Sequence, residues 1–297
     1  MNLSPWYRVP LLGIFLLFLC SASWAEQNPS NGKIKTFVSI LPQAYFVKRI
    51  GGSLVNVEVL VGPGQSHETY EPSPRQMVAL AETQIYFRIG LPFEDQLLKK
   101  IIASHENLKV IDTRDHVPLH PMEDSPTEEG HNHGVGIPDP HIWLDPSLVQ
   151  IQGRTICNAL KEIDPVHASE YEENLSRFIS DLETINAKNA KILAPYKGKE
   201  FFVFHPAFGY FARAYGLEQV AVETGGREPS PKQLATLINR AKQERVKVIF
   251  VQPQFSSKSA QTIAKAIGGI VIPIDPMDKD YLKNLETISG KINEALR

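Results

Sequence analysis

Short apolar runs separated by amphipathic stretches predict that strands and helices alternate along the first half of the chain. Residues 55–61 alternate between apolar and polar and then become continuously apolar, as a strand buried on both faces does. Pro42 in its first turn and Gly51-Gly52 at its end bound a helix over 42–50. The predicted strands of this half are 36–40, 55–61, 84–89 and 108–111; a helix begins at Ser73, and others cover 42–50, 93–103 and 147–163.

The second half repeats this alternation. Its predicted strands are 201–204, 219–222, 246–251 and 270–274, and its predicted helices are 207–215, 230–244, 258–267 and 280–296. Strands that alternate with helices are typical of parallel sheets. The sequence therefore predicts an α/β fold with parallel sheets.

One short motif occurs in both halves. Glu71-Pro72-Ser73-Pro74-Arg75-Gln76-Met77 matches Glu228-Pro229-Ser230-Pro231-Lys232-Gln233-Leu234, and each copy follows a buried strand and a loop and opens a helix. In the first copy, serine at the cap, proline in the first turn and glutamine three residues after the cap are typical of a helix start. A chance match is the alternative, but the shared position favours two related lobes.

A single apolar stripe near the middle of the chain predicts a long helix over 166–193. Tyr171, Leu175, Phe178, Leu182, Ile185 and Ile192 share one helix face. Asp164 is expected to cap this helix and Pro165 to open it. The helix would span about 42 Å, which suits a rigid connection between two lobes; a coiled-coil arm is the alternative. The predicted organisation is a signal segment 1–25, an N-terminal lobe 26–165, the linking helix 166–193 and a C-terminal lobe 194–297.

The first residues are typical of a cleaved secretory signal. Arg8 supplies positive charge, residues 11–19 are almost wholly apolar, and Ser23-Trp24-Ala25 offers small residues at both key positions for cleavage. The apolar run is too short for a transmembrane anchor. Lipidation at Cys20 is the alternative, although Leu19 occupies a position where such signals carry a small residue. The net charge of −2 gives no reason to expect nucleic acid as a partner.

Residues 115–138 have no periodicity, are acidic and contain proline, so we expect a long exposed loop. This loop could capture a metal transiently, or it could be only a solvated connection that happens to contain histidines. Its histidines are His116, His120, His131 and His133.

His141 lies between two Asp-Pro pairs, in the segment Asp139-Pro140-His141-Ile142-Trp143-Leu144-Asp145-Pro146. Each proline restricts its own φ and the conformation of the residue before it. We expect a stiff, non-helical segment whose apolar residues are buried, so that the His141 side chain is held in position.

Other candidate ligands come directly after predicted strands. His67 follows 55–61, His205 closes 201–204, and Asp275 closes 270–274. Ligands of open parallel sheets bind outside the carboxyl ends of the strands. Two lobes that face each other there would bring these residues and His141 together, and three imidazoles with one carboxylate suit a first-row metal such as zinc. Alternatively, His205 caps the next helix and Asp275 is a turn residue before proline.

The chain resembles the metal-binding solute-binding proteins of ABC transporters of the ZnuA/TroA type. The resemblance covers nearly the whole mature chain. It implies two α/β lobes joined by a rigid helix, periplasmic location, and His67, His141, His205 and Asp275 as ligands of one metal in the cleft. Manganese-type members usually have glutamate where this chain has His205, which favours zinc. The histidine-containing loop is short for a zinc-type member, and the cysteine pair of some members is absent. The motifs that carry the resemblance are the His67 loop with Tyr70-Glu71-Pro72-Ser73-Pro74, the Asp139–Pro146 segment, the long helix with Tyr171 and Asn174, and Phe204-His205-Pro206-Ala207-Phe208-Gly209-Tyr210-Phe211.

These features predict a periplasmic protein, not an enzyme, that captures Zn²⁺ and delivers it as a monomer to a membrane permease. A manganese or iron carrier of the same family is the first alternative, and an added adhesin role stays open. A secreted zinc hydrolase is another, with Glu68 or Glu223 as base, although no His-Glu-x-x-His motif is present. Whether Glu68 or a water replaces Asp275 as fourth ligand also stays open.

Overall fold

The structure, a computed structural model, describes residues 32–102, 108–122, 138–223 and 228–297. The predicted signal segment 1–25 lies outside the described residues, as do His131 and His133. Among the described helices, none combines the length and apolar character needed to cross a membrane.

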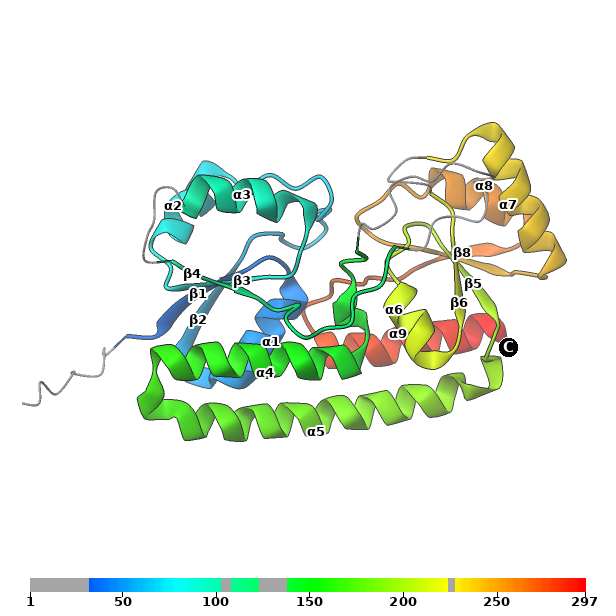
Figure 1. The fold of residues 1–297 in the computed structure, drawn as a ribbon. Helices are drawn as coiled ribbons and strands as arrows, with labels where there is room; N and C mark the ends of the chain where they lie inside the picture. Colours follow the sequence, from blue (N-terminus) through cyan, green and yellow to red (C-terminus); the bar gives the residue numbers. More distant parts are fainter. Residues whose placement is uncertain (1–31, 103–107, 123–137, 224–227) are drawn as a thin grey trace, which may run out of the picture. The chain divides into compact units, whose positions relative to one another are not determined.

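The N-terminal lobe is built on a parallel sheet of four strands in the order β2-β1-β3-β4. Helices α2 and α3 lie on one side of this sheet, and α1 and α4 on the other (Figure 1). β1 lies between β2 and β3, and its last two residues, Phe37 and Val38, are both buried, as expected for a strand covered on both faces. The bounds are β1 Ile34–Val38, α1 Leu41–Gly51, β2 Val55–Val59, α2 Pro74–Ala81, β3 Ile85–Arg88, α3 Pro92–Ile102, β4 Lys109–Asp112 and α4 Pro146–Ile163.

The C-terminal lobe has a second parallel sheet, in the order β6-β5-β7-β8. Numbered from the first strand of each lobe, the two orders are identical, which supports two related lobes. The prediction of an α/β fold with two parallel-sheet lobes is confirmed. The bounds are β5 Glu200–Val203, α6 Gly209–Tyr215, β6 Glu218–Ala221, α7 Pro231–Gln243, β7 Val248–Val251, α8 Lys258–Ile267, β8 Ile270–Pro273 and α9 Tyr281–Leu296.

The repeated motif forms the same helix start in both lobes. Ser73 caps α2, and its hydroxyl accepts from the backbone N–H of Gln76, whose side chain bonds back to the Ser73 N–H. Ser230 and Gln233 make the same capping box at α7. The matched sequence therefore specifies matched local structure.

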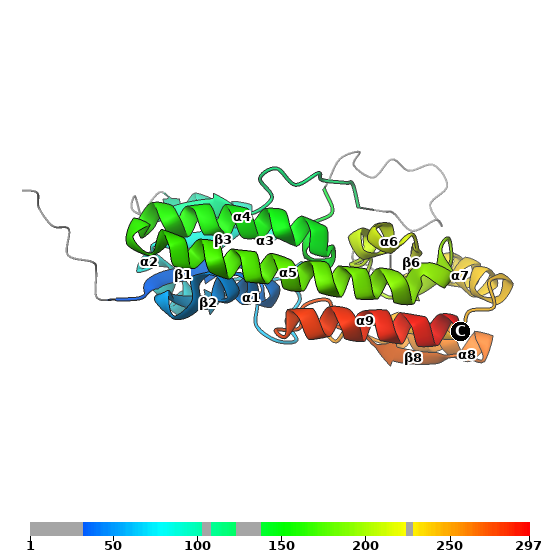
Figure 2. The same ribbon diagram turned by 90° about the horizontal axis from the view of Figure 1, so that it is seen from below.

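The predicted long helix is α5, Ala168–Leu193, which runs along α4, α1 and α9 (Figure 2). Its buried face includes Tyr171, Phe178 and Leu182. The alternative of a free coiled-coil arm is wrong, because this face packs on helices of the same chain. The predicted cap is also wrong: Pro165 opens a short 3-10 turn, Pro165–His167, and Asp164 instead accepts from the Tyr171 hydroxyl at 2.8 Å.

One continuous core joins the lobes. It runs from the N-terminal sheet through α1, α4, α5 and α9 to one face of the C-terminal sheet, whose other face packs on α7 and α8. Tyr281, the first residue of α9, packs edge-on against Phe46 of α1 and donates from its hydroxyl to the Trp143 carbonyl at 2.6 Å. The Trp143 indole N–H donates to the Pro276 carbonyl at 2.8 Å. The segment that holds His141 is thus bonded to the chain between β8 and α9.

Candidate metal centre

Three histidines converge at the carboxyl ends of the strands. His67 lies in the loop between β2 and α2, His205 follows β5, and His141 directly precedes a 3-10 turn over Ile142–Leu144. Their exposed fractions are 2%, 1% and 0% respectively. The structure therefore brings together three of the four predicted ligands. His67 and His205 are 138 residues apart in the sequence.

The spacing of the imidazole nitrogens suits one small metal ion. The Nε2 atom of His141 lies 3.1 Å from that of His67 and 3.4 Å from that of His205. One nitrogen from each ring belongs to a set whose members all lie within 4.8 Å of one another. Tetrahedral zinc with Zn–N bonds of 2.0–2.1 Å would hold its nitrogens about 3.3 Å apart. The ring positions thus already approach the geometry that zinc requires.

Two carboxylates determine which nitrogen carries the proton in the rings of His141 and His205. His141 Nδ1 lies 2.6 Å from Asp139 Oδ1, and His205 Nδ1 lies 2.5 Å from Glu223 Oε1. An ionised carboxylate only accepts, so each Nδ1 must donate. In the neutral rings, the lone pairs are then on the Nε2 atoms, which face the centre of the group. This is the arrangement that a metal-ligating histidine needs.

His67 is held in its neutral form by its surroundings. Burial, followed by the nearby His141 and His205, lowers the pKa of the His67 imidazole well below its usual value of 6.5. A neutral imidazole can bind a metal without first releasing a proton. His67 is therefore available as a ligand throughout the neutral pH range.

The His141 segment is stiff and buried, as predicted. The Asp139 carboxylate accepts from the His141 backbone N–H at 2.9 Å, and Ile142, Trp143 and Leu144 are buried. The segment is not fully non-helical, because Ile142–Leu144 form the 3-10 turn. The same Asp139 thus positions both the backbone and the ring of His141.

His205 is supported by residues that sequence reasoning did not single out for this role. The Gln252 side-chain amide accepts from the His205 N–H at 3.1 Å and donates to its carbonyl at 2.6 Å. The Phe255 ring stacks on the imidazole, with centroids 4.5 Å apart. His205 makes no cap on α6, so that alternative is wrong. Glu223 and Gln252 both follow strands, β6 and β7, and the rule that identified the ligands could have found them.

The structure does not bring Asp275 into the imidazole group. Its Oδ1 atom accepts from Gln254 Nε2 and from the Met277 N–H, both at 2.9 Å. Among the described residues, no metal-suited set includes Asp275. Glu68 lies nearer: its Oε1 is 3.4 Å from His205 Nε2, and it forms a second set with His205 and Glu223.

Comparison with known proteins identifies the family. The family model described as "Zinc-uptake complex component A periplasmic" (ZnuA) matches residues 37–295. The chain belongs to the ZnuA family. A structure titled "Crystal structure of ZnuA" is 41% identical, with a TM-score of 0.83 over 89% of this chain and 100% of that one. A zinc-bound ZnuA deletion mutant is likewise 41% identical, covering 89% of this chain and 98% of that one, with a TM-score of 0.81.

Curated relatives agree with this family. "Zinc-binding protein AdcA" of Streptococcus pyogenes serotype M3 is 28% identical over 93% of this chain. This chain covers 59% of that relative, so it spans about three fifths of its length. A "Putative metal-binding protein" of Treponema pallidum is 27% identical over 96% of this chain and 93% of its own length.

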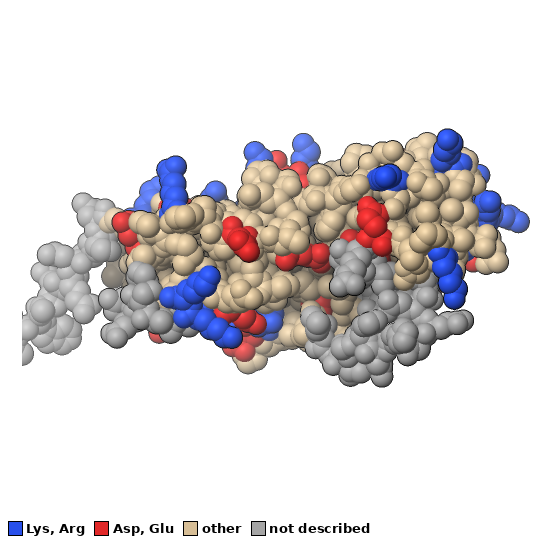
Figure 3. Space-filling view, turned by 90° about the horizontal axis from the view of Figure 1, so that it is seen from above, with Lys and Arg blue, Asp and Glu red and all other residues tan. Residues whose placement is uncertain are grey.

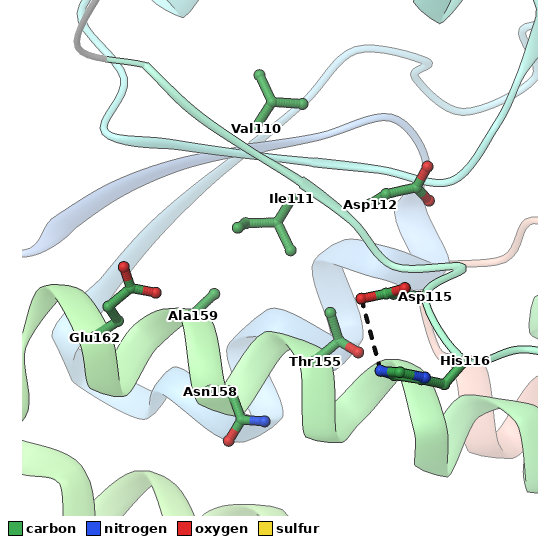
Figure 4. Close-up of a pocket in the computed structure, with 9 residues that line it drawn as sticks. All are labelled: Val110, Ile111, Asp112, Asp115, His116, Thr155, Asn158, Ala159 and Glu162. Atoms are coloured by element: carbon green, nitrogen blue, oxygen red, sulfur yellow. Dashed lines mark ion pairs between the residues drawn. The ribbon is translucent and has the colours of Figure 1, made fainter.

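The described histidines of the 115–138 loop lie outside the imidazole group of this ZnuA-family chain. The His120 N–H donates to the Tyr210 hydroxyl at 2.9 Å. His116 is exposed and adopts a φ of 64°. Its Nε2 atom lies 3.8 Å from Asp115 Oδ2, and both residues line a pocket of about 380 Å³ (Figure 4). Residues of β4, of the turn after it and of α4 line this pocket, and no member of the imidazole group does: Val110, Ile111, Asp112, Asp115, His116, Thr155, Asn158, Ala159 and Glu162.

Acidic side chains also lie near the middle of the face that carries α3, α7 and α8 (Figure 3). Glu68, on the loop that carries His67, keeps a quarter of its side chain exposed. Negative charge beside a buried set of neutral imidazoles favours the approach of a cation.

Proposed function

We propose that this chain is the periplasmic solute-binding component of an ABC transporter, which captures Zn²⁺ and delivers it to a membrane permease. The observation that carries this proposal is the meeting of His67, His141 and His205, with Nε2 separations of 3.1 and 3.4 Å and two Nδ1 protons held by carboxylates. Membership of the ZnuA family supports the same assignment.

For the fourth coordination position, the sequence pattern proposes Asp275 and the geometry favours Glu68. Asp275 would have to give up its hydrogen bonds with Gln254 and Met277 to reach the metal. Glu68 already contacts His205 Nε2 and needs no such change. We therefore assign three imidazoles and Glu68 to the zinc-bound state, with Asp275 as the competing ligand.

The proposed route of release is a small relative tilt of the lobes that removes one ligand. The lobes 26–165 and 194–297, with the linking helix 166–193, remain proposals for the domain boundaries. Packing of α5 on helices of both lobes, and the contact of Tyr281 with Phe46, support a stiff connection. We also propose export through residues 1–25 and a monomeric protein.

Metal content tests this function. The protein is stripped with a chelator, dialysed against equal zinc and manganese, and analysed by mass spectrometry for wild type and His205→Ala. We expect a single zinc in the wild type and its loss in the variant. Manganese in the wild type would overturn the zinc assignment, and absence of both metals would mean that the histidines are structural.

A further inference from the structure

The three imidazoles have almost no contact with solvent. His67, His141 and His205 are 2%, 0% and 1% exposed, and the two carboxylates that bond to their rings, Asp139 and Glu223, are buried as well. A cation that arrives from solution must therefore pass the residues around these side chains before it reaches an imidazole nitrogen.

Glu68 is a side chain that meets both the solvent and the imidazole group. It lies in the loop between β2 and α2, and a quarter of its side chain is exposed. The Ser66 hydroxyl accepts from the Glu68 N–H at 3.2 Å, and the Tyr70 hydroxyl donates to the Leu60 carbonyl at 2.6 Å. The Glu68 carboxylate thus extends from an anchored loop to the buried ring of His205.

The Nε2 atom of His205 has two neighbours at the same distance. It lies 3.4 Å from Glu68 Oε1 and 3.4 Å from His141 Nε2. In the neutral ring this atom carries a lone pair, because Glu223 holds the ring proton at Nδ1. Among the described residues, two metal-suited sets share His205: one with His67 and His141, the other with Glu68 and Glu223. His205 therefore connects an outer, partly exposed position with the buried one.

We propose that Glu68 and His205 form an entry position for the divalent cation, from which it passes to the three imidazoles. This inference rests on the proposed function. A tetrahedral zinc ion with bonds of about 2.0–2.2 Å would hold two ligand atoms about 3.4 Å apart. Glu68 Oε1 and His205 Nε2 have this separation. Water completes the coordination at the entry position, and the ion then exchanges this water for the Nε2 atoms of His67 and His141.

A carboxylate suits the first contact because the ion loses its hydration there. Moving a charged group away from water is costly unless an opposite charge compensates it. The imidazoles are neutral and cannot supply that charge, whereas Glu68 carries it at the edge of the site. Its bond to the ion can persist while the inner ligands bind, which agrees with Glu68 as the fourth ligand of the zinc-bound state.

An entry ligand differs kinetically from a ligand that only holds the bound ion. Loss of a ligand that binds late raises the dissociation rate and leaves the association rate unchanged. Loss of an entry ligand raises the barrier that the ion crosses in both directions, so the association rate falls and dissociation changes less. The two rate constants together therefore separate the two roles.

Stopped-flow fluorescence of the mature chain, residues 26–297, measures both rates. Of the three tryptophans, only Trp143 lies in this range. Its ring centroid is 5.1 Å from that of His141 and 6.0 Å from that of His67, so its emission should report occupation of the site. Metal-free protein is mixed with Zn²⁺ for association, and zinc-loaded protein with a chelator for dissociation. A chromophoric chelator in competition gives the same rates independently of Trp143.

The test variant is Glu68→Gln, and Glu71→Gln is the matched control. Glu71 is an exposed glutamate of the same loop, so its loss removes the same charge. We expect Glu68→Gln to lower the association rate constant about tenfold. At an ionic strength of about 0.15 M, where attraction between distant exposed charges is largely screened, Glu71→Gln should associate at the wild-type rate.

Two results would overturn the inference. The first is an unchanged association rate in Glu68→Gln, with or without faster dissociation, which would leave Glu68 no role in entry. The second is equal slowing in Glu68→Gln and Glu71→Gln, which would mean that the general charge of the loop attracts the cation. Failure of the proposed function looks different: wild type and His141→Ala would then bind zinc equally.

Discussion

The Nε2 atoms of His141 and His205 face each other at 3.4 Å, and in the neutral rings neither has a proton to give the other. Asp139 and Glu223 hold the ring protons at the two Nδ1 atoms. Two lone pairs therefore point at one place inside a buried site. Such an arrangement is unfavourable by itself and becomes favourable when a cation lies between the nitrogens.

Removal of a proposed ligand gives the most direct prediction. His141→Ala should lower zinc affinity more than the roughly 10–100-fold that loss of an outer partner typically causes. Competition with a chelator measures this. His116→Ala is the matched control, because His116 is exposed and lies outside the imidazole group. Equal affinities of the two variants would contradict the assigned site.

Glu223 should affect zinc affinity although its carboxylate contacts Nδ1 of His205 and not the metal-facing Nε2. Glu223→Gln can donate to Nδ1, which would move the ring proton to Nε2 and block the metal. We expect zinc affinity to fall roughly 10–100-fold. Isothermal titration of the metal-free variant measures this, with Glu218→Gln on the exposed start of β6 as control. Wild-type affinity in Glu223→Gln would show that the Glu223–His205 bond does not set the tautomer.

A glycine allows Asp139 to approach α6. A Cβ atom at residue 209 would lie 2.9 Å from Asp139 Oδ2, whereas a Cβ at residue 290 would meet nothing within 4 Å. Gly209→Ala should therefore displace Asp139 and weaken zinc binding through His141. Gly290→Ala should leave zinc binding unchanged and stabilise α9 by about 0.5–1 kcal/mol. Zinc affinities and urea unfolding of both variants test the pair; similar affinities would mean that Asp139 has room to move.

The sequence located the three histidines because simple rules apply to them: two follow strands and one lies between prolines. The same rule also selected Asp275, which the structure leaves outside the imidazole group, bonded to Gln254 and Met277. In the order β6-β5-β7-β8, the strand before Asp275 is two places from the strand before His205, or about 10 Å away. Strand order depends on tertiary packing, which local patterns do not contain.

Partners of the ligands were harder to predict than the ligands. The bond from Asp139 to His141 is local, and the Asp139-Pro140-His141 motif contains both residues. The bonds of His205 with Glu223 and Gln252 join three different strand ends and depend on side-chain rotamers. The helix boundaries, by contrast, follow local signals such as Ser73 and Ser230, and these were predicted closely.

Acid should destabilise the metal-free protein partly through His67. The folded-state pKa of His67 is depressed, so below about pH 6.5 the unfolded chain takes up a proton that the folded chain does not. The free energy of unfolding then falls as pH decreases from 6.5 toward the folded-state pKa, by at most about 1.4 kcal/mol per pH unit from this group. Urea unfolding of chelator-treated protein from pH 8 to 5 measures the slope.

His67→Asn should flatten that slope, since asparagine does not titrate. His167→Asn is the control, because the His167 side chain is more than a third exposed and lies in the turn between α4 and α5, paired with Asp164. An unchanged slope in His67→Asn would show that His67 is protonated alike in both states.

The contact between Tyr281 and Trp143 should contribute to stability across the two lobes. Tyr281→Phe removes the hydroxyl that donates to the buried Trp143 carbonyl at 2.6 Å. The buried carbonyl of Trp143 would then lack this hydrogen-bond donor, so we expect the free energy of unfolding to fall by about 1–3 kcal/mol. Tyr196→Phe, which loses a half-buried bond to Asn293 at 3.1 Å, should cost less. Urea unfolding at neutral pH ranks the two variants. A smaller loss for Tyr281→Phe than for Tyr196→Phe would mean that the lobes are held together by apolar packing alone.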